Sequence, residues 1–158
     1  MPQTDWVSKF VPIPEKDLGI LYRSNIGHDF GGWSECLFFN DFYKGYDFFI
    51  FVNSSALGPF LPDNYKGKWT DIYINGLQNN IKLFGSTINN EVGGDYFSPS
   101  EFAHVQSYIF SMGRETLEFL MDEKIFSAKH YPKTKREAIL DYEVAMSRKI
   151  IKNDGNIG

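Results

Sequence analysis

An unbroken apolar run from Phe48 to Val52, followed at once by Asn53, Ser54 and Ser55, constrains the fold more than any other stretch of the sequence. Aromatic and β-branched residues in such a run predict a strand buried on both faces, as at the centre of a parallel or mixed sheet. Small polar side chains at the carboxyl end of that strand mark the edge where open α/β sheets bind ligands. The alternative is an ordinary turn that leaves the sheet, because Asn and Ser also dominate turns.

Along the rest of the chain, predicted strands and helices alternate, which is typical of an α/β architecture. The length of 158 residues suits one domain, over residues 1–158. Further strands are predicted at Leu18–Tyr22, Ile81–Ser86 and Val105–Ser111. Helices are predicted at Trp33–Phe42, Trp69–Leu77, Arg114–Asp122 and Thr134–Asn153, with a short helix that starts at Ser98. We therefore expect a mixed sheet flanked by helices.

Composition narrows the partners and the compartment. A net charge of −4 and a pI near 5.3 argue against nucleic acid as the main partner. Cys36 is the single cysteine, so the chain cannot form an internal disulfide, and no Cys/His cluster resembles a zinc site. The sequence shows no signal peptide and no apolar run long enough to be a transmembrane segment. These features predict a soluble, cytoplasmic protein.

Polar residues also gather in a glycine-rich turn after the first predicted strand, where Asn25, His28 and Asp29 lie. If that strand runs parallel to Phe48–Val52, both following loops open at the same edge of the sheet. His28 and Asp29 then become neighbours of Asn53 and the serines after it. The alternative is that Asp29 caps the following helix and His28 is a solvated loop residue.

A second polar cluster, HVQS, contains His104, Gln106 and Ser107. Successive side chains of a strand point to opposite faces, so only some of these can face one site. A lone histidine is more often structural than a ligand. No nucleophile-elbow pattern surrounds Ser55 or Ser107, which argues against a serine hydrolase.

Two carboxylates, Asp141 and Glu143, lie near the middle of the last predicted helix. They are about 200° apart around the helix axis, so only one of them can point inward. The simplest alternative is that both are solvated helix charges.

Four segments carry a resemblance that covers Leu18 to Gly158. They are NIGHDFGGW, YDFFIFVNSSALGPFLP, HVQSYIFSMGRETLEFL and DYEVAMSRKIIKNDGNIG. Together they resemble glycosyltransferase-like proteins of polysaccharide and capsule biosynthesis, with the rhamnan-synthesis glycosyltransferases as distant kin. The most specific elements are NSS-x-x-GPFLP and HVQS. The resemblance implies a GT-A-type fold that transfers a sugar from a nucleotide-sugar donor to a glycan acceptor.

The resemblance also implies roles for particular residues. In the GT-A fold an Asp-x-Asp motif at the end of a central strand binds a divalent cation, Mn or Mg, and the donor diphosphate. Asn53-Ser54-Ser55 occupies that place without a carboxylate. The donor is then held either by neutral hydrogen bonds or through a metal, for which Asp29 is the nearest carboxylate. Glu143 looks like the counterpart of the catalytic base, and His104 and Gln106 would help to hold donor or acceptor.

One departure from the family pattern concerns the amino terminus. The GT-A fold begins with a strand–helix–strand unit that grips the nucleotide base, and only a short segment precedes NIGHDFGGW. We expect that unit to be missing or shortened. The sequence therefore fits a minimal enzyme, a fragment that completes a larger transferase with a partner chain, or a non-catalytic module that binds carbohydrate or nucleotide-sugar.

Overall fold

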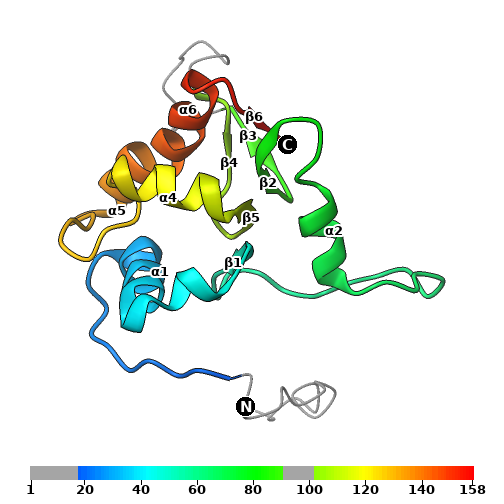
Figure 1. The fold of residues 1–158 in the computed structure, drawn as a ribbon, viewed down its shortest axis with the longest axis horizontal. Coiled ribbons are helices and arrows are strands. Elements are labelled where there is room, and N and C mark those ends of the chain that lie inside the picture. The colour runs from blue at the N-terminus through cyan, green and yellow to red at the C-terminus, as the bar shows by residue number, and fades with distance from the viewer. Residues whose placement is uncertain (1–17, 91–101) are drawn as a thin grey trace, which may run out of the picture.

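A four-stranded mixed sheet forms the centre of the protein, with strand order β1–β5–β2–β6. The structure is a computed structural model that describes residues 18–90 and 102–158 (Figure 1). β5 runs antiparallel to both β1 and β2, and β6 runs parallel to β2. The strands of this sheet are β1 (Phe48–Val52), β2 (Ile81–Gly85), β5 (Ile109–Gly113) and β6 (Asn156–Ile157). A separate antiparallel pair consists of β3 (Ile88–Asn89) and β4 (His104–Val105).

Helices lie on both sides of the sheet, with α1, α4 and α6 on one side and α2 on the other (Figure 1). Their bounds are α1 (His28–Phe38), α2 (Trp69–Asn75), α4 (Arg114–Asp122), α5 (Lys135–Glu137) and α6 (Ala145–Lys152). A 3₁₀ segment, η3 (Phe39–Gly45), follows α1, and a π-helical segment, η4 (Ala138–Val144), joins α5 to α6. The protein is thus a mixed α/β fold, as the alternating pattern predicts.

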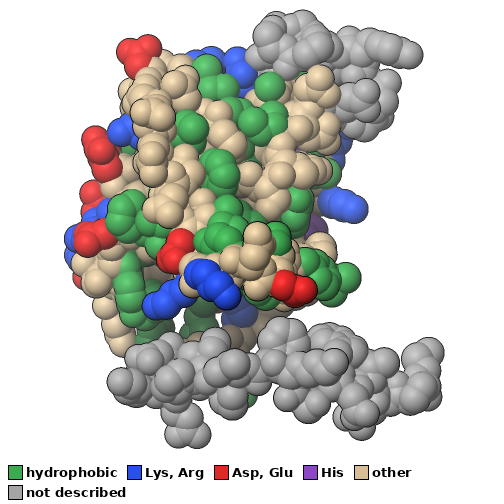
Figure 2. Space-filling model, turned by 90° about the vertical axis from the view of Figure 1, so that its right-hand side faces the viewer, with side chains coloured by type: hydrophobic (Ala, Val, Ile, Leu, Met, Phe, Trp, Pro, Cys, Tyr) green, Lys and Arg blue, Asp and Glu red, His purple; other side chains and the backbone are tan. Residues whose placement is uncertain are grey.

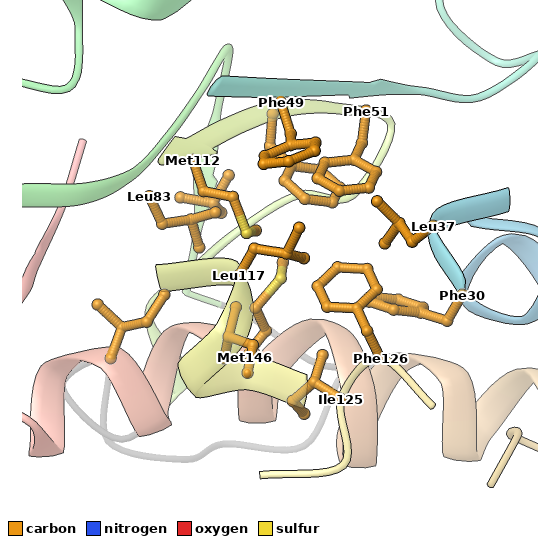
Figure 3. Packing of buried hydrophobic residues seen from close by; sticks show 14 residues of the cluster. Phe30, Leu37, Phe49, Phe51, Leu83, Met112, Leu117, Ile125, Phe126 and Met146 are labelled. Atoms are coloured by element: carbon orange, nitrogen blue, oxygen red, sulfur yellow. The ribbon is translucent and has the colours of Figure 1, made fainter. Parts of the chain in front are cut away.

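The main core lies between the sheet and helices α1, α4 and α6 (Figure 3). Phe49 and Phe51 of β1 face this core and pair with Met112 and Phe110 of β5. The rings of Phe51 and Phe110 are stacked, with centroids 4.8 Å apart. Burial of one such side chain contributes about 1.5–3 kcal/mol. A slip of one residue between β1 and β5 would turn these rings outward, so the core determines the strand register.

The other face of the sheet is covered in part by α2. The Ser111 hydroxyl of β5 donates a hydrogen bond of 2.7 Å to the carbonyl of Tyr73. Gly76, which follows α2, lies directly over the ring of Phe84, and a Cβ there would be 2.4 Å from the ring. Because only glycine fits at this distance, Gly76 allows the end of α2 to approach the sheet closely.

Four of the elements predicted from the sequence are confirmed. They are the strand β2, the helices α2 and α4, and the long helical segment that starts after Thr134. The Thr134 hydroxyl accepts a hydrogen bond of 3.1 Å from the N–H of Glu137 and so caps the start of this helical segment. The predicted helix start at Ser98 lies outside the described residues.

The prediction that Phe48–Val52 is a central strand buried on both faces is wrong. β1 is at the edge of the sheet, and Phe48 and Val52 point away from the core and are exposed. The run is apolar on both sides, but only one of its faces meets the main core.

Three other predicted elements are also wrong or displaced. Leu18–Tyr22 forms no strand, and no described strand pairs with it. The segment is largely exposed. The helix predicted to begin at Trp33 begins at His28 instead. The strand predicted over Val105–Ser111 is divided by a turn at residues 107–108, so β4 and β5 belong to different sheets.

Candidate functional site

An open cleft of about 420 Å³ lies where α1 begins, β1 ends and the last helical segment passes. Residues predicted from the sequence to form a site make up much of its wall. These are His28, Asp29, Asn53, Ser55, Gln106, Ser107 and Glu143. The structure therefore brings together residues from four separate segments of the chain.

Asp29 and Asn53 form one side of the cleft. Gly27 has a left-handed conformation, with φ of 77°, and α1 starts directly after it, which places Asp29 in the first turn of the helix. The side-chain amide of Asn53 donates a hydrogen bond of 3.0 Å to the carboxylate of Asp29. The two residues are neighbours as predicted, although the predicted reason, a parallel strand before Asp29, is wrong.

The Asn53 side chain also shapes the turn that follows β1. Its carbonyl oxygen accepts a hydrogen bond of 2.9 Å from the backbone N–H of Ser55. The backbone N–H of Asn53 donates to the carbonyl of Tyr108 at 3.0 Å, which extends the pairing of β1 with β5. Ser55 lines the cleft, whereas Ser54 is exposed and does not.

Glu143 forms the opposite side of the cleft, on the π-helical segment η4. One carboxylate oxygen, Oε2, accepts two hydrogen bonds from Ser107, one of 2.6 Å from the backbone N–H and one of 2.5 Å from the hydroxyl. The Glu143 side chain is 15% exposed, so it remains accessible from the cleft. π-Helical segments are rare and often occur at functional sites.

His104 lies behind Glu143 and is buried. Its Nδ1 atom is 2.5 Å from the carbonyl oxygen of Phe102, so Nδ1 is the protonated nitrogen. The other ring nitrogen, Nε2, is 3.5 Å from Oε1 of Glu143. A neutral ring would present a lone pair to the carboxylate, so this arrangement favours the doubly protonated, charged histidine.

The pKa values of both groups shift accordingly. Burial, the largest influence on Glu143, opposes its charged form, but hydrogen bonds from His104 and Ser107 together outweigh burial and lower the pKa of the carboxyl group. Burial also opposes the charged form of His104, but hydrogen bonds to Glu143 and Phe102 and the Glu143 charge raise the pKa of the imidazole. Each shift favours the charged form of its group, so the contact stabilises the imidazolium and the carboxylate together.

The turn between β4 and β5 is held by Thr87. Its hydroxyl donates a hydrogen bond of 2.7 Å to the side-chain carbonyl of Gln106, and its backbone carbonyl accepts one of 3.1 Å from the Gln106 N–H. The hydroxyl of Tyr108 lies 3.3 Å from the same Thr87 hydroxyl. These contacts position Gln106 and Tyr108 in the cleft wall.

The donor atoms around Asp29 do not suit a divalent cation. Asn53 turns its amide NH₂ toward Asp29 and commits its oxygen to Ser55, so it offers no oxygen ligand there. Among residues 18–90 and 102–158, no group of three or more His, Cys, Asp or Glu side chains could hold a metal ion. Mn²⁺ or Mg²⁺ prefers several charged oxygen ligands, and this site provides one carboxylate.

Three of the predicted residues, Asn25, Ser54 and His104, lie outside the cleft wall. Of these, His104 contributes through its contact with Glu143. Sequence reasoning also missed Lys135 and Tyr108, which line the cleft. The spacing of Lys135, Ile139 and Glu143, four residues each, would have indicated that these three share one side of the helical segment.

Comparison of the chain with protein-family models, with curated proteins and with solved structures gives no match. Within the described part of the chain, no helix has the length and apolar character needed to cross a bilayer.

Proposed function

We propose that the protein is a glycosyltransferase with a GT-A-like fold that transfers a sugar from a nucleotide-sugar donor to a glycan acceptor in the cytoplasm. The observation that carries the proposal is the single cleft shared by Asn53, Ser107 and Glu143. These residues come from distant segments, each of which contributes to the family resemblance. Such convergence of polar groups is the usual mark of a ligand site.

In this proposal Glu143 is the catalytic base. The Glu143 carboxylate is ionised at neutral pH, as a base requires, while the hydrogen bonds from His104 and Ser107 that lower its pKa reduce its strength as a base. Glu143 removes the proton of the acceptor hydroxyl, the hydroxyl oxygen forms a bond to the anomeric carbon, and the bond from that carbon to the nucleoside diphosphate breaks. His104 and Ser107 hold the carboxylate in place.

The donor diphosphate binds without a metal in this proposal. Lys135 lines the cleft and supplies a positive charge, while Ser55 and Gln106 offer neutral polar groups. This arrangement agrees with the absence of a carboxylate at Asn53-Ser54-Ser55 and with the unsuitable donor atoms around Asp29.

A second candidate is a non-catalytic module that binds nucleotide-sugar or carbohydrate, alone or as part of a larger transferase with a partner chain. The observation that favours it is the double hydrogen bond from Ser107 to Glu143, which is also what a structural clamp would show.

The two candidates are distinguished by measuring donor hydrolysis and sugar transfer in the wild-type protein and in the Glu143→Gln variant. Glutamine keeps the shape of the side chain but cannot act as a base. We expect loss of turnover with donor binding nearly intact. The matched control is Asp141→Asn, an exposed residue of the same segment η4, which should retain activity. Turnover that survives in Glu143→Gln would contradict the assignment of the base.

A further inference from the structure

A second hollow, of about 480 Å³, opens between α2 and the loop that follows β1. We call it the α2 groove. Four aromatic rings line it, from Phe60, Trp69, Tyr73 and Tyr108. Figure 2 looks onto the side of the molecule where α2 lies and shows hydrophobic side chains spread over this face, with charged side chains at its edges and in its lower part. Val52 of β1, which points away from the main core, also lines the groove, so the α2 groove lies on the face of the sheet opposite that core.

The α2 groove adjoins the candidate functional cleft. Ser55 and Tyr108 line both hollows. Both residues lie at the end of β1 and β5 where the Asn53 N–H bonds to the Tyr108 carbonyl. The two hollows therefore meet at this junction, and Glu143 lines the one beyond it.

The lining of the α2 groove has a distinct chemistry. No described Asp, Glu, Lys or Arg side chain lines it. Trp69 and Tyr73, one helical turn apart, place their rings 5.9 Å from each other, and the Tyr73 hydroxyl lies 2.6 Å from the hydroxyl of Ser86. Flat rings bordered by hydroxyl groups suit a ligand with apolar faces and neutral hydroxyl groups, which is the chemistry of a saccharide.

The Phe60 side chain, which lines the α2 groove, is 85% exposed. Its ring is therefore available to a ligand in the groove, and covering it would be favourable.

We propose that the α2 groove binds the acceptor as a neutral oligosaccharide, with the reacting hydroxyl directed past Ser55 and Tyr108 into the cleft. The assignment of this saccharide as acceptor rests on the proposed function. Saccharide binding itself rests on the groove alone, so the two can fail separately.

The test is a printed array of neutral, amino-sugar and acidic glycans, followed by calorimetric titration of the neutral oligosaccharide that binds best. Phe60→Ala should weaken binding about tenfold, as expected for removal of an aromatic contact at a binding site. Trp69→Ala should weaken it at least as much. The matched control is Tyr22→Ala, which removes an aromatic ring that is 90% exposed and lies outside both hollows.

The proposal would be overturned by no binding of any neutral glycan, by binding of acidic glycans only, or by unchanged affinity in Phe60→Ala. Binding of octyl glucoside without binding of neutral oligosaccharides would also overturn it, because the groove would then take an alkyl chain. Nucleotide-sugar binding is measured separately by thermal shift. If the wild-type protein binds a neutral glycan but no nucleotide-sugar, the proposed function is contradicted and the α2 groove remains a saccharide site.

Discussion

Ser107 donates two hydrogen bonds to the same carboxylate oxygen of Glu143, one from its backbone N–H and one from its hydroxyl. The contact joins the turn between β4 and β5 to the helical segment η4, across 36 residues of sequence. It orients the carboxylate that we propose as the base, and it links the pKa of that group to the geometry of one turn.

Ser107→Ala removes one of these two hydrogen bonds. We expect a loss of about 1 kcal/mol in the free energy of unfolding. Because the hydroxyl stabilises the charged carboxylate, its removal should also raise the pKa of Glu143 and move the acidic limb of the activity profile to higher pH. Urea denaturation and a pH titration of activity measure the two effects. Ser54→Ala, at an exposed position outside the cleft wall, is the control and should change neither.

The pair of His104 and Glu143 makes stability depend on pH in a defined window. Because the pKa of His104 is raised in the folded protein, protonated His104 adds to the free energy of unfolding at any pH below the pKa of an unfolded histidine. This contribution is lost as the pH rises through the raised pKa of the folded protein. Because the pKa of Glu143 is lowered in the folded protein, ionised Glu143 adds to the free energy of unfolding at any pH above the pKa of an unfolded glutamate. This contribution is lost as the pH falls through the lowered pKa of the folded protein. Both contributions are fully present between about pH 4.3 and 6.5.

His104→Gln should therefore lose about 2 kcal/mol of unfolding free energy within that window, as expected for a hydrogen bond to a charged group, and less above it. Urea denaturation of both proteins between pH 4 and 9 tests this expectation. A constant difference between the two proteins at every pH would show that His104 acts by packing alone.

Asn53→Ala should weaken donor binding about tenfold, because the side chain orients both Asp29 and the turn at Ser55. Isothermal titration with the donor that the wild-type protein binds gives the comparison. Asn25→Ala, outside the cleft wall, serves as the control. Equal affinity of the Asn53 variant and the wild type would exclude this turn from the site.

Gly76→Ala tests the close approach of α2 to the sheet. The added methyl group would overlap the Phe84 ring, so we expect a loss of about 1–3 kcal/mol in the free energy of unfolding. Gly45→Ala is the control, because no other atom lies within 4 Å of a Cβ at that position. A smaller residue at Phe84 should restore part of the loss, and a failure to do so would argue against the overlap as its cause.

Elements that depend on local pattern were predictable from the sequence. The α4 helix has its predicted bounds, Arg114–Asp122, because helical periodicity is contained within the segment. Pairing was not predictable in the same way, because it depends on partners far along the chain. Leu18–Tyr22 has the composition of a strand but no described partner, and β1 proved to be an edge strand paired with β5.

The sequence predicted many of the residues that form the candidate site, but it did not predict how they are arranged. Asp29 and Asn53 lie together, but the start of α1 brings them together and not a parallel strand. The hydrogen bonds of Glu143 to Ser107 depend on a turn that interrupts the strand predicted at Val105–Ser111. Such a break depends on long-range packing, which a local pattern does not encode.

The central claim is that the cleft binds a nucleotide-sugar without a metal, and a thermal-shift screen against nucleotide-sugars, with and without manganese, tests it most directly. A ligand that binds only the folded state stabilises it by about 2.7 kcal/mol at a concentration of 100 Kd. We expect a rise in Tm of about 5 °C or more with at least one nucleotide-sugar, the same with and without manganese, and a smaller rise in Asn53→Ala. No rise with any nucleotide-sugar would contradict a donor site in this cleft, and a rise that requires manganese would contradict metal-free donor binding.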